Sequence, residues 1–131
     1  MAKYAYPAVF TPEKGGGFSI LFPDLENCYT CGDNMVDSLL LAEDVLALVL
    51  YGYERDGRKI PPPSDETGIP LSKGEFINYI ACDTLEYRKM YNNKAVKKTL
   101  TIPEWLNEAA MAMGLNFSQI LQEALLSKIQ L

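Results

Sequence analysis

The sequence predicts an α+β protein in two parts, and three patterns support this. Residues 1–91 contain four short strand-like runs and one long amphipathic helix. Their order, strand, strand, strand, helix, strand, is typical of one sheet with a helix across it. Residues 92–131 instead predict one strand followed by two short helices, and the balance of charge changes at the same boundary. We therefore expect two domains, 1–91 and 92–131.

The charge is unevenly distributed along the chain, whose formal net charge is −5. Residues 1–90 hold 8 basic and 14 acidic side chains, whereas residues 91–131 hold 4 basic and 3 acidic ones. Lys94, Lys97 and Lys98 lie together on the predicted C-terminal strand. Because phosphate attracts a basic ribbon and repels an acidic body, the second part suits nucleic acid and the first suits a basic protein.

The first part opens with a predicted β-hairpin, formed by residues 4–10 and 18–22 around a glycine-rich turn. A break at residues 23–27 precedes a brief third strand at 28–31, and residues 76–83 predict a fourth. Residues 85–91 predict a short turn of helix.

The long helix begins after Asn34, a good N-cap residue, with Asp37 as its capping-box acid. We expect it to run to about Tyr51 and to end at Gly52, followed by a polar loop over residues 54–63. Its apolar positions cover more than one face. One side should therefore pack on the sheet, and the other should meet a partner or another element.

The predicted strand at residues 94–102 has two different faces because strand side chains alternate. Its apolar face consists of Val96, Leu100 and Ile102, and its polar face includes Lys97, Thr99 and Thr101. Pro103 ends the strand, and Gly114 separates the two helices that follow. Asn116 predicts the N-cap of the second helix, with Gln119 three residues later.

A lone strand with two small helices cannot satisfy its backbone or bury much apolar surface. Both problems disappear if two chains pair their strands antiparallel and interlock their helices. The resulting two-stranded ribbon would expose Lys97, Thr99 and Thr101 and would fit the major groove of B-DNA. The alternative is a plain C-terminal dimerisation hairpin, which does not explain the basic and hydroxylic face.

Residues 94–131 resemble the ribbon-helix-helix DNA-binding fold, through the alternating strand, Thr101–Pro103 and the Gly114–Ser118 junction. The resemblance implies that Lys97, Thr99 and Thr101 read base edges, and Lys94 is expected to contact phosphate. It also implies that the helix start, at Asn116, Phe117 and Ser118, holds a phosphate, which helix-end physics favours. Asn116 could equally serve as a cap alone.

The residue types in the chain argue against an enzyme and against a metal or cofactor site. The chain has no histidine, so serine and cysteine nucleophiles lack a histidine base. Cys28 and Cys31 form a C-x-x-C, but zinc would need two more ligands and only one other cysteine exists. The acids Asp24, Glu26, Asp33 and Asp83 form no spaced pair on a helix. We expect no catalytic residue, no metal and no cofactor, and a cytoplasmic protein without a membrane span.

Five blocks in order along nearly the whole chain resemble the HicB-type antitoxins. They are residues 6–10, 16–25, 28–33, 57–63 and 83–88, the last just before the DNA-binding segment. The resemblance implies a truncated ribonuclease-H-like N-terminal domain that binds a HicA-type, RNA-cleaving toxin. It implies a C-terminal domain that dimerises and binds operator DNA, and it leaves open whether dimers pair further.

The charge distribution fits that implied function, because an RNA-cleaving toxin is expected to be basic. We expect toxin neutralisation by occlusion, through the acidic turn Asp24, Leu25 and Glu26 and through Asp33 at the end of the third strand. The alternative for each is an ordinary polar turn residue. The alternative function is a stand-alone ribbon-helix-helix regulator with an acidic sensing domain.

Overall fold

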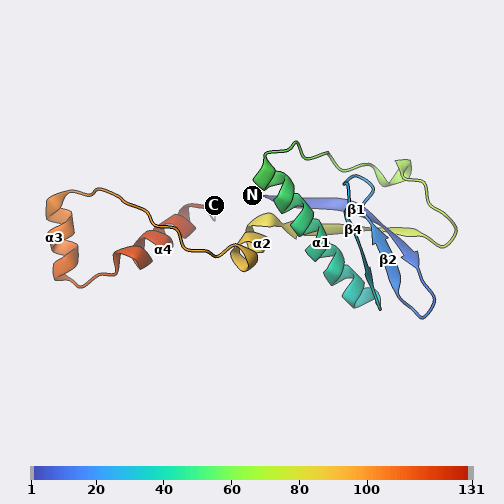
Figure 1. The fold of residues 1–131 in the computed structure, drawn as a ribbon, viewed down its shortest axis with the longest axis horizontal. Helices are drawn as coiled ribbons and strands as arrows, with labels where there is room; N and C mark the ends of the chain where they lie inside the picture. The colour runs from blue at the N-terminus through green and yellow to red at the C-terminus, as the bar shows by residue number, and fades with distance from the viewer. Residues whose placement is uncertain (1, 130–131) are drawn as a thin grey trace. The chain divides into compact units, whose positions relative to one another are not determined.

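The computed structural model describes residues 2–129, shown in Figure 1. Residue 1 and residues 130–131, the outer ends of the two expected domains, lie outside the described part. The chain divides into two compact units, Met1–Lys94 and Ala95–Leu131.

The first unit is built on a four-stranded antiparallel sheet, as the sequence predicts. Its strands are β1 (Lys3–Pro12), β2 (Phe18–Leu21), β3 (Tyr29–Gly32) and β4 (Phe76–Asp83), in the spatial order β3-β2-β1-β4. β1 pairs with β4 over eight residues, from Lys3 opposite Asp83 to Phe10 opposite Phe76. β3 and β4 are therefore the two edge strands.

The core lies between the sheet and α1 (Met35–Asp56), which crosses it in Figure 1. On β1 the inward positions Tyr6, Ala8 and Phe10 are almost completely buried, because alternate side chains share one face. They pack with a larger set from β2 and the residue after it, from α1 and from β4, which includes Ile20, Phe22, Leu46, Leu50, Tyr53 and Ile80. The α+β class is thereby confirmed.

α1 begins as predicted but ends later than predicted. The Asn34 side chain accepts a hydrogen bond from the Asp37 amide, 2.8 Å long, so the expected N-cap is confirmed. The predicted end at Gly52 is wrong: the helix continues to Asp56, and Gly57 ends it in the left-handed region with φ 66°. A glycine inside a helix costs only about 1 kcal/mol, and burying Tyr53 in the core offsets that cost.

The late end also corrects the predicted polar loop at residues 54–63, since residues 54–56 are helical. Further along the connection from α1 to β4 lies a short 3₁₀ turn, η1 (Glu66–Gly68). The predicted short helix is present as α2 (Thr84–Tyr91), which follows β4 directly. It packs against the second half of α1, where the rings of Tyr51 and Tyr87 lie 5.3 Å apart.

The second unit contains α3 (Glu104–Ala112) and α4 (Phe117–Ile129), as the sequence predicts. Gly114 lies between them with φ 67°, the left-handed conformation expected at the end of the first helix. Residues 92–103 form no strand in the described single chain. A strand needs a second strand beside it, so the predicted strand pairing between two chains stays a prediction.

Between residues 2 and 129, no helix combines the length and the apolar character needed to cross a bilayer.

Candidate functional site

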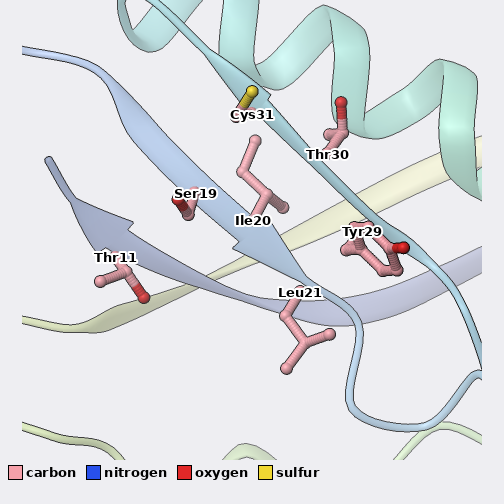
Figure 2. Close-up of a pocket in the computed structure, with 7 residues that line it drawn as sticks. All are labelled: Thr11, Ser19, Ile20, Leu21, Tyr29, Thr30 and Cys31. Carbon is pink, nitrogen blue, oxygen red and sulfur yellow. The ribbon is translucent and has the colours of Figure 1, made fainter.

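The outer face of the sheet, away from α1, carries an open hollow of about 450 Å³ at β2 and β3. Figure 2 shows the seven residues that line it, Thr11, Ser19, Ile20, Leu21, Tyr29, Thr30 and Cys31. Leu21 and Tyr29 are direct cross-strand partners, and they are 50% and 64% exposed. The sequence analysis did not identify Leu21 and Tyr29 as candidate contact residues. The available signal was the alternation of strand side chains, which separates these two from their buried neighbours. Large apolar side chains exposed on a sheet face favour contact with a partner protein.

Two of the predicted toxin-contact residues are used inside the first unit. Asp24 accepts hydrogen bonds from the Ser64 amide, at 2.9 Å, and from the Ser64 hydroxyl. It thus ties the turn after β2 to the loop after α1. Leu25 is only 5% exposed and belongs to the core, so its side chain anchors the turn and is not part of the accessible surface.

The other two predicted toxin-contact residues, Glu26 and Asp33, are exposed. They flank β3, since Glu26 lies three residues before it and Asp33 directly follows it. The edge strand therefore has a carboxylate near each end, with Tyr29 between them. This arrangement can meet a basic protein surface through both charge and apolar contact.

The two C-x-x-C thiols lie in different environments. Cys28 is buried, and burial raises the pKa of its thiol to about 12. Cys31 is exposed and lines the hollow of Figure 2. A thiol that stays protonated is a poor nucleophile and a poor metal ligand, so Cys28 acts as an apolar core residue.

Lys94, the last residue of the first unit, and Lys97, Thr99 and Thr101 of the second unit are all exposed on the extended segment that precedes α3. They are spaced two or three residues apart, and Lys97, Thr99 and Thr101 would share one face if the segment became a strand. The structure brings these groups to the surface, and it leaves their predicted contact with DNA bases untested.

The start of α4 has the geometry expected for anion binding. Asn116 caps the helix, because its side-chain oxygen accepts a 3.1 Å hydrogen bond from the Gln119 amide. The Gln119 side chain binds Glu123 rather than returning to Asn116, so the capping box is incomplete. Phe117 and Ser118 are the first two helical residues, whose amides have no acceptor in a preceding turn. A phosphate oxygen can accept from such amides.

The second unit also has a large apolar groove of about 500 Å³ between the extended segment and the two helices. Its lining residues are mostly aliphatic: Leu100, Ile102, Leu106, Asn107, Ala110, Leu115, Phe117, Ile120, Leu121 and Ala124. No residue in α3 or the described part of α4 is buried in the single chain. Apolar side chains of both helices thus remain partly exposed in the single chain, and apolar surface of this kind favours contact with a partner surface.

Comparison with known protein sequences gives a consistent result for the first unit. Residues 5–76 match the family described as "HicB_like antitoxin of bacterial toxin-antitoxin system". "Antitoxin HicB 1" of Photorhabdus laumondii is 32% identical over 100 residues, which cover 71% of this chain and 64% of that protein. "Antitoxin HicB" of Escherichia coli is 32% identical over 59 residues, 45% of this chain and 43% of that protein. The aligned part is thus under two thirds of either relative's length.

Solved structures resemble the chain over nearly its whole length. A chain of "Toxin-Antitoxin complex from Streptococcus pneumoniae" is 27% identical, with a TM-score of 0.62, and the match covers 96% of this chain and 99% of that one. "Antitoxin HicB3 crystal structure" is 26% identical, with a TM-score of 0.53 and coverage of 96% and 98%.

Proposed function

This chain belongs to the HicB-like antitoxin family, which is not a family of enzymes, and we propose that it neutralises a HicA-type RNA-cleaving toxin and represses its own operon. The first unit binds the toxin, and the second dimerises and binds operator DNA. The observation that carries the toxin role is the family match over residues 5–76, which lies entirely within the first unit. A solved toxin–antitoxin complex with similar fold and 27% identity adds support.

Charge supports a basic toxin as the partner of the first unit. Residues 1–90 carry a net charge of −6, so this surface attracts a protein evolved to hold RNA and repels RNA itself. Glu26 and Asp33, on either side of β3, remain the proposed contacts from the predicted set. Asp24 and Leu25 support this surface from behind by holding the turn in place.

The test of the toxin role is co-purification of the full chain with the product of the adjacent small gene, followed by an RNA-cleavage assay. We expect a tight complex in which cleavage is silenced. Operator binding without any toxin complex would instead favour a stand-alone regulator with a sensing domain.

For the second unit we propose a homodimer in which residues 94–102 of two chains pair antiparallel. The exposed apolar groove and the absence of buried side chains in α3 and the described part of α4 support this arrangement. The ribbon would present Lys97, Thr99 and Thr101 to the major groove, with Lys94 and the start of α4, at Asn116, Phe117 and Ser118, on phosphates.

The DNA role is tested with fragments of the operon's own promoter. Thr99→Ala should weaken operator binding by about 1–3 kcal/mol and relax specificity at one base pair. Lys94→Ala should weaken binding to all sequences alike and flatten the salt dependence. Unchanged operator affinity after replacing Lys97, Thr99 and Thr101 together by alanine would contradict the ribbon.

A further inference from the structure

A second groove in the first unit lies between α1, β4 and α2, on the opposite edge of the sheet from β3. It has a volume of about 200 Å³. Carboxylates line its rim, from Glu43 and Asp44 on α1, Asp83 at the end of β4 and Glu86 on α2. Apolar and aromatic groups supply the rest of its lining: Ala47, Cys82, Tyr87, Met90 and Tyr91.

The groove continues into an apolar stripe on the first half of α1. Val36 and Leu40 are 68% and 60% exposed, and they precede Asp44 at intervals of four residues, which places all three on one side of the helix. Further along this side of α1, α2 provides cover, as the Tyr51–Tyr87 ring contact shows. The first half of the helix therefore has a surface that resembles a helix–helix contact with one partner missing.

β4, which has an open edge, approaches α1 at two points. Asn78 Nδ2 lies 4.0 Å from the Met35 sulfur at the start of α1, and Cys82 lines the groove with Glu43. Within residues 2–129, β4 pairs with β1 on one side only, along its whole eight-residue length. Its other edge presents backbone donors and acceptors that an incoming strand can pair with.

The charge of the groove determines which class of partner can bind there. Burial, and after it the Glu43, Asp83 and Glu54 carboxylates, raise the pKa of the Cys82 thiol to about 12. The carboxylates that line the groove give it a negative field. Nucleic acid would be repelled by that field. A second copy of the first unit would bring like charges together, because this unit is itself acidic. A basic protein is the partner that both the charge and the apolar stripe accommodate.

We propose that the groove bounded by α1, β4 and α2 is a docking surface for the basic toxin. The toxin adds an extended segment to the open edge of β4 and places a lysine or arginine side chain beside the carboxylates of Glu43 and Asp44, whereas Glu86 already pairs with Lys89 at 3.0 Å. Val36 and Leu40 supply the apolar contact beside it. This inference rests on the proposed toxin-binding function and names a second surface for it, separate from the one proposed at Glu26 and Asp33 beside the opposite edge strand β3.

The test measures toxin affinity of full-chain variants by calorimetry. Asp44→Lys reverses an exposed charge in the groove, and Glu66→Lys makes the same change in η1, outside it. Leu40→Ser is matched by Leu71→Ser, an exposed leucine in the loop before β4. We expect each groove variant to weaken binding at least tenfold and each control to change it less than twofold. Unchanged thermal unfolding verifies that the variants fold.

A second readout requires no mutation. In the unaltered complex, the amides of β4 should exchange hydrogen more slowly than in the free chain, since a new strand would protect that edge. Groove variants that bind like their controls, or a β4 that exchanges equally fast in the complex, would overturn the groove and leave the antitoxin function standing. An unaltered chain that binds no toxin would overturn both.

Discussion

At the residue scale, Glu54 connects segments that are far apart in the sequence. Its carboxylate accepts hydrogen bonds from the Tyr4 hydroxyl at 2.8 Å and from the Arg88 guanidinium at 3.0 Å. The Thr84 hydroxyl lies 2.9 Å from the same carboxylate. Thr84 in turn contacts the backbone of Ala2. One acidic side chain on α1 thus joins the start of β1 to both ends of α2's first turn.

The pKa of Glu54 makes stability depend on pH. Burial alone would raise this pKa, but the hydrogen bonds from Tyr4, Arg88 and Thr84 lower it to about 2. The folded pKa lies below the ordinary value of 4.5, so the contribution is complete above pH 4.5 and is lost as the pH falls toward 2. We expect Glu54→Gln to remove about 3 kcal/mol of stability at pH 7 and to flatten the loss between pH 4.5 and 2. Urea unfolding at several pH values measures both effects.

Asp56→Asn is the matched control for Glu54→Gln. Asp56 lies two residues later and pairs with Arg55, but both side chains are well exposed. Exposed pairs contribute little, so this variant should unfold like the unaltered chain. Equal effects from the two variants would show that the Glu54 contacts do not stabilise the fold.

Gly32 is the residue at which strand and helix approach most closely. A Cβ added there would lie 2.7 Å from Ser38 Cα and closer still to the Ser38 hydroxyl, which is itself buried. We expect Gly32→Ala to destabilise the first unit by about 1–3 kcal/mol, because backbone atoms of β3 and α1 would have to separate. Thermal unfolding measures this, and a melting temperature equal to that of the unaltered chain would contradict the close packing.

At the element scale, the length of α1 shows how core contacts override a local stop signal. Gly52 lies inside the helix, and nothing lies within 4 Å of a Cβ added to it. Gly57 supplies the left-handed residue, and its amide and that of Arg58 bind the Glu54 and Tyr53 carbonyls. The extra turn places Tyr53 in the core and Glu54 within hydrogen-bonding distance of Tyr4 and Arg88.

The two glycines should respond in opposite ways to the same substitution. Gly52→Ala should leave stability unchanged or raise it by up to about 1 kcal/mol, because alanine favours the helix interior. Gly57→Ala should lower stability by about 1 kcal/mol, because its φ of 66° is strained for alanine. Circular dichroism melts compare them, and a reversed order would mean that α1 ends at Gly52 after all.

At the scale of the whole molecule, the two units differ in what they need to be stable. The first unit has its own core between sheet and helix. In the second, Leu100, Ile102, Leu106 and Phe117 all line an open groove and remain 40–58% exposed. We therefore predict that its folded state depends on concentration, as it does for obligate dimers.

Leu106→Asp tests that dependence. A carboxylate in the groove would be desolvated when two chains interlock, so we expect the dimer to dissociate and operator binding to be lost, while the first unit still unfolds cooperatively. Met111→Asp makes the same change on α3 outside the groove and should leave the dimer intact. Sedimentation at several concentrations reports the state, and a Leu106→Asp dimer would contradict the pairing.

The sequence by itself determined the elements with strong local signals. Side-chain periodicity predicts the four strands and the helices α2, α3 and α4. The caps at Asn34 and Asn116 follow from an asparagine with a hydrogen-bonding partner three residues later. The family followed from short blocks in order. These features depend on neighbours within a few residues, and such neighbours are visible in a linear pattern.

Only the tertiary structure decided the features that join distant residues. The Asp24–Ser64 bond spans 40 positions and the contact of Thr84 with Ala2 spans 82. The same long-range packing buries Leu25, which the sequence predicts at the surface, and places Glu54 among its hydrogen-bonding partners. It also gathers acids that are far apart in the chain around the groove along α1. The predicted strand at residues 94–102 goes one step further, because the backbone partner that we propose for it belongs to a second chain.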